Sequence, residues 1–169
     1  MNKKQIIILS IVFIILVTAV AFKFFIQGQD VRAAKEVYAP LSLSFDPAVV
    51  EKIVIERGVG TAPVELVKEN GQWSVKSFWG AKADEEKVKS LLDALQGAKG
   101  ELRSADKALL KDFGIEDQDA IVLKLKNAAD ASLLDLKIGT QKAGFDGFFI
   151  RKAGASEVYF ADVPFDRLL

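Results

Sequence analysis

The chain has 169 residues, half of them hydrophobic, and its 23 Lys and Arg residues balance 23 Asp and Glu residues. A net charge of zero disfavours a nucleic-acid-binding protein, because such proteins normally carry a basic excess. The sequence contains no Cys and no His, which excludes disulfides, thiolate chemistry and the imidazole group that most often serves as general base or transition-metal ligand.

An apolar stretch from Ile6 to Phe22 contains no charged residue, Gly or Pro, and the apolar character continues to Ile26 after Lys23. A membrane-spanning helix needs about 20 mostly apolar residues, which this stretch reaches if Lys23 extends its amine to the headgroups. Lys3 and Lys4 precede it, so the positive-inside tendency places the N-terminus in the cytoplasm. We expect residues 1–27 to be a cytoplasmic tip and single-pass anchor in the bacterial inner membrane.

Ala19-Val20-Ala21 leaves a cleaved signal peptide as an alternative, because signal peptides carry such a pattern after an apolar region of roughly 7–15 residues. The apolar stretch is longer than that. Cleavage after Ala21 would also leave a mature chain beginning Phe-Lys-Phe-Phe-Ile, so a retained anchor is favoured. In both cases the rest of the chain lies outside the cytoplasm.

Residues 28–44 are interpreted as a tether, since they mix polar residues with a Pro and show no sustained period, and the domain boundary is placed near Leu41. Residues 45–169 then form one exported domain of ordinary size. Asp46-Pro47 is typical of a capped helical turn. Ile53–Arg57 is rich in β-branched residues and ends at a Gly, which predicts a strand.

Asn70-Gly71 is the clearest local signal in the chain, because it separates two alternating segments, Val64–Glu69 and Gln72–Ser77. Asn-Gly is the preferred pair for a two-residue type I′ turn, in which both residues need positive φ. A hairpin is therefore predicted. Its expected cross-strand pairs are Glu69 with Gln72, Lys68 with Trp73, Leu66 with Val75 and Glu65 with Lys76.

Asp84 predicts the start of a helix that Gly97 and Gly100 end. Its apolar residues recur at helical spacing and form a single stripe: Val88, Leu91, Leu92 and Leu95. A stripe of this kind must be covered, and the preceding hairpin supplies a sheet on which it can pack. The segment Ser104–Phe113 predicts a shorter helix with Leu109, Leu110 and Phe113 facing inward.

Four strands follow, each with alternating apolar and polar residues. They are Ile121–Lys126, Leu133–Ile138, Phe148–Arg151 and Val158–Phe160. Their short connections favour antiparallel pairing, because a parallel crossover needs about a dozen residues or more. The expected fold class is α+β: an N-terminal transmembrane helix followed by a mostly antiparallel, meander-like sheet with one main packed helix.

Short motifs follow one another in order along the exported part: Ile53-Val54-Ile55, Val64-Glu65-Leu66, Gly71-Gln72-Trp73, Ala83-Asp84, Asp112-Phe113-Gly114-Ile115, Leu136-Lys137-Ile138-Gly139, Gly147-Phe148-Phe149-Ile150-Arg151 and Val158-Tyr159-Phe160. With this order and spacing, residues 41–160 resemble a bacterial family catalogued as domain of unknown function 4340. The resemblance implies a membrane-anchored, extracytoplasmic protein, and some relatives are encoded with ABC-type transport or gliding-type machinery. It supplies no catalytic residues. Family members often continue with further domain after the last strand.

Two loops offer candidate ligand groups. Glu116-Asp117-Gln118-Asp119 has carboxylates for a divalent cation but lacks the Gly and the distal Glu of a calcium loop, so a solvated turn is the simpler interpretation. Gly139–Gly147 is glycine-rich, but no Gly-Lys-Ser/Thr closes it and no helix follows, so it is not a phosphate loop. It is either a plain hairpin loop or a recognition loop that carries Phe145. No metal, cofactor or catalytic residue is expected.

Aromatic and apolar residues outside the predicted main core are the candidates for partner contact. Trp73 is assigned to the core, whereas Phe78 and Trp79 either cover the start of the helix or form a contact surface. On the sheet face away from the main core, the apolar residues form either a docking surface or a second small core. The candidate contact residues are Val122, Leu133, Phe149, Phe145 and Trp79.

These observations lead us to expect a non-catalytic binding or scaffolding protein, bound to the bilayer through its N-terminal helix and to an envelope protein partner. The family resemblance suggests an accessory part of an ABC-type transport or gliding-type assembly. The alternative is a carboxylate-dependent enzyme that acts on envelope polymers. A pair of inward-facing carboxylates in a pocket would favour that alternative.

Overall fold

The computed structural model describes residues 41–141 and 147–169. The chain divides into two compact units, Met1–Ala39 and Pro40–Leu169, and the described residues belong to the second unit. The expected anchor, residues 1–27, therefore lies outside the described residues. Within the described ranges, no helix combines the length and the apolar composition needed to cross a membrane.

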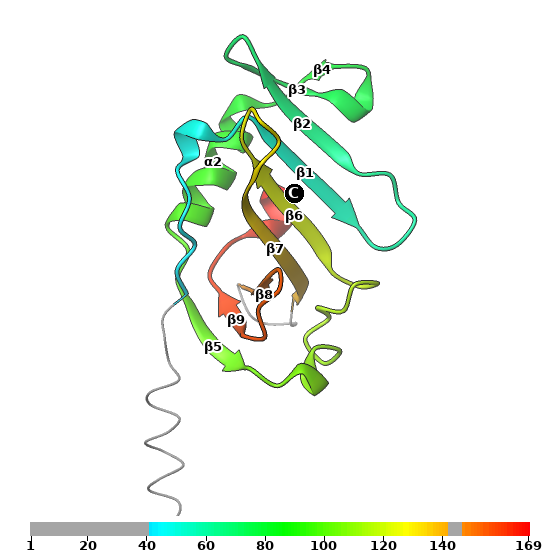
Figure 1. Cartoon of the computed structure of the whole chain (residues 1–169), viewed down its shortest axis with the longest axis vertical. Helices are drawn as coiled ribbons and strands as arrows, with labels where there is room; N and C mark the ends of the chain where they lie inside the picture. Colours follow the sequence, from blue (N-terminus) through cyan, green and yellow to red (C-terminus); the bar gives the residue numbers. More distant parts are fainter. Residues whose placement is uncertain (1–40, 142–146) are drawn as a thin grey trace, which may run out of the picture. The chain divides into compact units, whose positions relative to one another are not determined.

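A nine-stranded antiparallel sheet is the frame of the second unit (Figure 1). Its strands are β1 (Lys52–Arg57), β2 (Val64–Glu69), β3 (Gln72–Val75), β4 (Ala81–Lys82), β5 (Gly100–Ser104), β6 (Ile121–Lys126), β7 (Ser132–Gln141), β8 (Phe148–Lys152) and β9 (Val158–Ala161). They lie in the order β4-β3-β2-β1-β6-β7-β8-β9-β5. Two meanders, β1 to β4 and β6 to β9, are joined by the β1–β6 pair, and β5 closes the far edge. The predicted α+β class with a mostly antiparallel sheet is confirmed.

The β2–β3 hairpin has the predicted turn. Asn70 and Gly71 have φ of 53° and 82°, both in the left-handed region that a type I′ turn requires. Three of the expected pairs are present: Glu69 with Gln72, Lys68 with Trp73 and Leu66 with Val75. The local turn chemistry therefore sets the register of the hairpin.

The fourth expected pair, Glu65 with Lys76, is not formed. Strand β3 ends at Val75, and Lys76–Phe78 turns away as a short 3-10 helix, η2. The carboxylate of Glu65 lies instead 3.6 Å from the Nζ atom of Lys52 on β1. Strand β1 pairs with β2 but is not part of the hairpin. It supplies the cation that lies beside Glu65 in place of Lys76.

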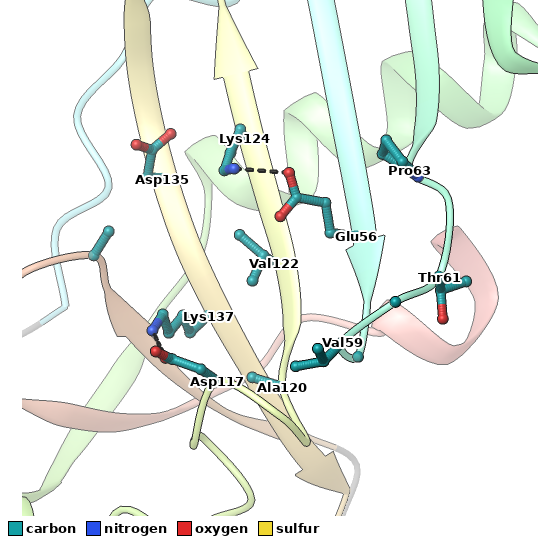
Figure 2. Close-up of a pocket in the computed structure, with 13 residues that line it drawn as sticks. Glu56, Val59, Thr61, Pro63, Asp117, Ala120, Val122, Lys124, Asp135 and Lys137 are labelled. Carbon is teal, nitrogen blue, oxygen red and sulfur yellow. Dashed lines mark hydrogen bonds and ion pairs between the residues drawn. The ribbon is translucent and has the colours of Figure 1, made fainter.

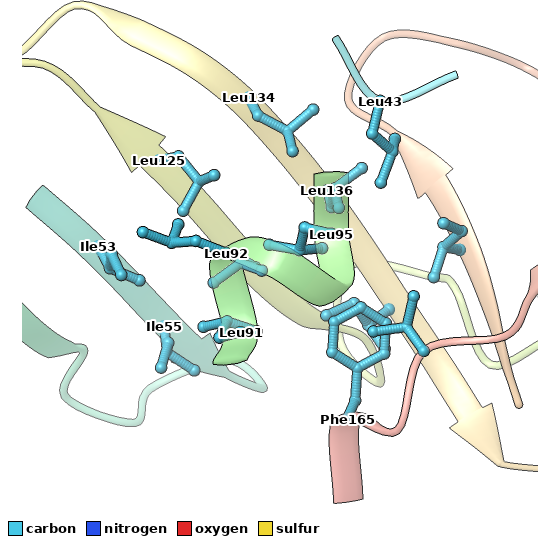
Figure 3. Packing of buried hydrophobic residues seen from close by; sticks show 14 of the residues in the cluster. Leu43, Ile53, Ile55, Leu91, Leu92, Leu95, Leu125, Leu134, Leu136 and Phe165 are labelled. Carbon is cyan, nitrogen blue, oxygen red and sulfur yellow. The ribbon is translucent and has the colours of Figure 1, made fainter. Parts of the chain in front are cut away.

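Helix α2 (Glu85–Gln96) has the predicted cap and stripe. The Asp84 carboxylate accepts hydrogen bonds from the N–H groups of Glu86 and Lys87, which would otherwise lack partners in the first turn. The four residues of the predicted stripe are all buried. Figure 3 shows Leu91, Leu92 and Leu95 over the sheet face that carries Ile53, Leu125 and Leu136. This layer of helix on sheet is the main hydrophobic core.

The predicted helix at Ser104–Phe113 is wrong. Gly100–Ser104 forms β5, and only Lys107–Leu109 is helical, as the single 3-10 turn η3. Leu109 is 40% exposed rather than directed inward. Pairing of β5 with β9 keeps the chain extended as far as Ser104. The N–H groups of Leu109, Leu110, Asp112 and Gly114 each donate to the carbonyl three residues back, which is the bonding of tight turns and not of a continuous α-helix. The Asp106 carboxylate then accepts a hydrogen bond from the N–H of Ala108 and begins the short turn.

The folded unit includes residues that the sequence assigned to the tether. Leu41 and Leu43 are buried in the main core, and the N–H of Leu41 donates to the carbonyl of Gly100 on β5. The predicted capped turn follows as the 3-10 helix η1 (Pro47–Val49). At the other end of the unit, the short helix α3 (Phe165–Leu168) buries Phe165 in the same core.

Candidate functional site

The face of the sheet opposite α2 carries charged side chains on three adjacent strands. On β6, Leu123 and Leu125 are fully buried beneath the helix, so the alternation of a strand places Val122 and Lys124 on the other face. The register places Glu56 of β1 beside Val122. The sequence pattern of these strands therefore builds one apolar and one charged face.

A cleft of about 490 Å³ lies on this charged face (Figure 2). Val122 is the apolar residue of the sheet within it. The loop after β1 forms one side, with Val59, Thr61 and Pro63, and the residues before β6 form another. The charged groups that line the cleft are Glu56, Asp117, Lys124, Asp135 and Lys137.

Most of these charges are paired within the protein. The Nζ of Lys124 donates to Oε1 of Glu56 at 2.7 Å, and the Nζ of Lys137 donates to Oδ1 of Asp117. The hydrogen bond from Lys137, together with its charge, lowers the pKa of Asp117 below its usual value of 3.8. Asp135 accepts a hydrogen bond of 2.7 Å from the hydroxyl of Ser132. Asp117 is therefore ionised at neutral pH and is suited to polar contact.

A second group of paired charges lies beside the cleft on the same face. The Nζ of Lys52 lies 3.6 Å from Glu65 and 3.4 Å from Asp130, and the Nζ of Lys126 lies 3.0 Å from Asp130. The hydrogen bond from Lys126 is the main reason that the pKa of Asp130 is lowered. Alternating positive and negative charge thus extends from the cleft toward β2.

The structure does not bring the predicted contact residues into one patch. Val122 lines the cleft, whereas Leu133 packs against the main core. Phe149 lies between two other rings, with centroid distances of 4.8 Å to Phe113 and 5.4 Å to Phe160. Phe145 lies outside the described residues. Phe113, Phe149 and Phe160 are each half-buried, so the three rings form an aromatic cluster outside the main core.

A family model described as a domain of unknown function, DUF4340, matches residues 73–169, which is more than half of the chain. The chain belongs to the DUF4340 family. The match begins in β3, so β1 and β2, which contributed to the sequence resemblance, precede it. No curated protein and no solved structure matches the chain. Function in this DUF4340 protein must therefore be argued from its surface.

The acidic loop of this DUF4340 chain is a closed turn. The N–H groups of Asp119 and Ala120 both donate to the carbonyl of Glu116, and Gln118 donates to the Glu116 carboxylate at 3.1 Å. In residues 41–141 and 147–169, no group of three or more acidic side chains is arranged to hold a metal ion. The loop contributes Asp117 to the cleft, a role that its sequence did not indicate.

Two aromatic residues project from the loop between β3 and β4. Phe78 is 62% exposed and Trp79 is 93% exposed, with ring centroids 4.9 Å apart. Trp73, by contrast, is buried in the main core as predicted. At this exposure Trp79 does not cover the start of α2. The DUF4340 domain therefore presents an aromatic tip, Phe78–Trp79, at the β4 edge of its sheet.

Sequence reasoning missed the charged cleft of the DUF4340 domain. The sequence does contain a pattern that indicates a charged sheet face, because Glu56, Lys124 and Lys137 alternate with apolar residues that point into the core. This alternation does not indicate the order of the strands in the sheet. Only the pairing of β1 with β6, and of β6 with β7, makes these side chains neighbours.

Proposed function

We propose that this chain is a membrane-anchored, extracytoplasmic binding or scaffolding protein, and that it contacts an envelope protein through the cleft on the charged sheet face. The anchor is the apolar stretch Ile6–Phe22, and the domain outside the cytoplasm is the folded unit that follows. The family resemblance suggests an ABC-type transport or gliding-type assembly as the setting. The observation that carries the proposal is the arrangement of paired charges around Val122.

An apolar centre surrounded by polar and charged groups is the usual anatomy of a protein interface. In the cleft, Val122 and Val59 provide the apolar centre, and the Glu56–Lys124 pair lies at its rim. Exposed ion pairs of this kind contribute little to folding. Their effect is to fix the orientation of a partner and to select against partners whose charges do not match.

The same geometry argues for binding over carboxylate-dependent catalysis. General acid catalysis needs a carboxyl group whose pKa is raised toward the working pH. In the cleft, the lowered pKa of Asp117 keeps that carboxyl group charged, and Glu56 is engaged by an ammonium group. These carboxylates are suited to accept hydrogen bonds from a partner.

Co-purification with the full-length, detergent-extracted chain tests the proposal. We compare the unchanged chain with the double variant Val59→Ser and Val122→Ser, which removes the apolar centre of the cleft. Val49→Ser, at an exposed apolar residue on η1, is the matched control. A partner should be lost from the cleft variant and retained by the control, with both variants melting as folded proteins. Retention of every partner by the cleft variant contradicts a role for the cleft.

The anchor is tested separately. The full chain should pellet with membranes and resist carbonate extraction, and a reporter fused after Leu169 should be active only outside the cytoplasm. A soluble form that begins near Phe22 would instead establish signal-peptide cleavage. An active cytoplasmic reporter contradicts the proposed topology.

A further inference from the structure

We propose that the aromatic tip, Phe78–Trp79, is a membrane-contact element that inserts into the headgroup region of a lipid bilayer and holds the domain against it. This inference rests on the proposed function, because the N-terminal anchor brings the domain to a membrane. It goes beyond that function by assigning a ligand, the lipid surface, to a site separate from the cleft.

The tip is exposed along its whole length. Every residue from Lys76 to Lys82 is exposed, including both aromatic residues. Single exposed apolar residues are common on folded proteins, but two adjacent aromatic rings with this exposure are not explained by packing of the domain. The tip therefore has no structural role in the described part of the core.

The exposed conformation is held by specific contacts. The N–H of Gly80 donates to the carbonyl of Val75 at 3.1 Å, and the hydroxyl of Ser77 accepts a hydrogen bond of 3.1 Å from the N–H of Glu65. Trp79 has a φ of 51°, a left-handed conformation that is unfavourable for a residue with a large side chain. An ordered turn therefore presents the indole outward at a conformational cost, which is typical of a functional position.

The chemistry of the tip suits the interface of a bilayer. An indole ring is apolar over most of its surface and carries one N–H donor, so tryptophan concentrates at the headgroup level of membranes. Lys76 and Lys82 flank the aromatic pair, but the Nζ of Lys82 lies 3.8 Å from Glu85, which offsets part of its charge. We therefore expect the aromatic rings to supply most of the attraction and anionic lipid to add little.

The size of the tip favours lipid over a protein partner. A stable protein interface covers about 800 Å² on each partner, with many residues around its centre. Here the exposed apolar surface is confined to two adjacent side chains on one turn. Two aromatic side chains at the tip of a turn are enough for a contact at the headgroup level, where tryptophan is enriched.

The chain is long enough for the tip to reach the membrane of its own anchor. The tip lies at the β4 edge of the sheet, whereas Leu41 joins β5 at the opposite edge (Figure 1). Nine strands spaced about 4.8 Å apart give a path of about 38 Å along the sheet, which is an upper bound on the distance between these edges because sheets twist. The 14 residues between Ile26 and Leu41 can span about 46 Å when extended.

Fluorescence of the full-length chain in vesicles tests the inference. The chain contains two tryptophans, so Trp73→Phe leaves Trp79 as the single reporter. The protein is reconstituted into phosphatidylcholine vesicles, with and without a minority of phosphatidylglycerol. We expect blue-shifted emission from Trp79, quenching by bromine-labelled lipid and protection from aqueous iodide. Trp79→Phe, which leaves only the buried Trp73, is the matched control and should respond to neither quencher.

The outcomes separate the two proposals. A chain that does not float with vesicles overturns both the anchor and the tip. A chain that floats, but whose Trp79 stays open to iodide and unquenched by bromolipid, overturns the tip alone. Shielding of Trp79 only after a protein extract is added would assign the tip to a protein partner and also overturn lipid contact. If Trp73→Phe does not fold, the difference between the unchanged chain and Trp79→Phe gives the same readout.

Discussion

The carboxylate of Glu56 and the ammonium group of Lys124 lie 2.7 Å apart, although they are 68 positions apart in the chain. The antiparallel pairing of β1 with β6 makes them neighbours, and together they form part of the rim of the cleft. The side chains are 37% and 33% exposed, so water screens their attraction. The pair therefore contributes little to the stability of the fold.

A double-mutant cycle measures the coupling free energy between Glu56 and Lys124. Glu56→Gln, Lys124→Met and the double variant are compared by chemical denaturation of the same chain. We expect a coupling free energy of about 0.2–1 kcal/mol, the range of solvent-exposed ion pairs. A coupling of several kcal/mol would contradict a screened pair and would indicate a structural role.

The ion pair between Asp117 and Lys137 predicts a pH dependence. Because the pKa of Asp117 is lowered in the folded state, its contribution to stability is present above the usual value of 3.8 and is lost as the pH falls through the lower, folded value. Titration followed by carboxyl NMR should find Asp117 below 3.8. Lys137→Met should raise the pKa of Asp117 toward 3.8, and an unchanged titration would reject the pairing.

The buried stripe of α2 predicts a contrast between adjacent positions. Leu91→Ala and Leu92→Ala each remove a buried side chain from the main core, so each should lower the free energy of unfolding by about 2–5 kcal/mol. Ser90→Ala, on the exposed side of the helix, should be nearly neutral. Equal effects at the three positions would show that the helix packs through a different face.

Substitution of Gly71 in the hairpin turn should destabilise the domain through backbone strain and not through a steric clash. A Cβ atom at Gly71 would meet no atom within 4 Å, but the φ of 82° strains any β-branched residue there. Gly71→Val should therefore destabilise the domain by more than about 1 kcal/mol. Asn70→Gly is the control and should have a smaller effect, because glycine tolerates the positive φ of that position. An unchanged melting midpoint for Gly71→Val argues against the turn.

At Gly139, in contrast, a larger side chain should destabilise the domain because the surrounding atoms leave no space for it. A Cβ atom at this position of β7 would overlap the carbonyl group of Phe113 and press against Ile115. Gly139→Ala should displace that segment and destabilise the domain by about 1–3 kcal/mol, the usual range for overpacking. Loss of the contact between Phe113 and Phe149 should follow, visible as altered aromatic NMR shifts. A variant with the original stability and shifts would show that the segment moves freely.

The sequence by itself determined the elements whose causes lie within a few residues. Asn70-Gly71 specified its hairpin because both residues accept positive φ, and the register followed from a two-residue loop. Asp84 and the leucine stripe specified α2 because capping and helical spacing are local properties. Family membership also followed from short motifs in a recognisable order.

Only the tertiary structure decided which distant segments became neighbours. The segment Gly100–Ser104 became an edge strand because β9 offered it hydrogen bonds, and the helix predicted to begin at Ser104 shrank to the single turn η3. The same kind of contact, between β1 and β6, created the charged cleft from residues far apart in the chain. Trp79 became exposed because β3 ended at Val75 and the turn that followed directed the indole outward. Local patterns do not encode these outcomes, since the free energy of strand pairing depends on a partner that the local sequence does not specify.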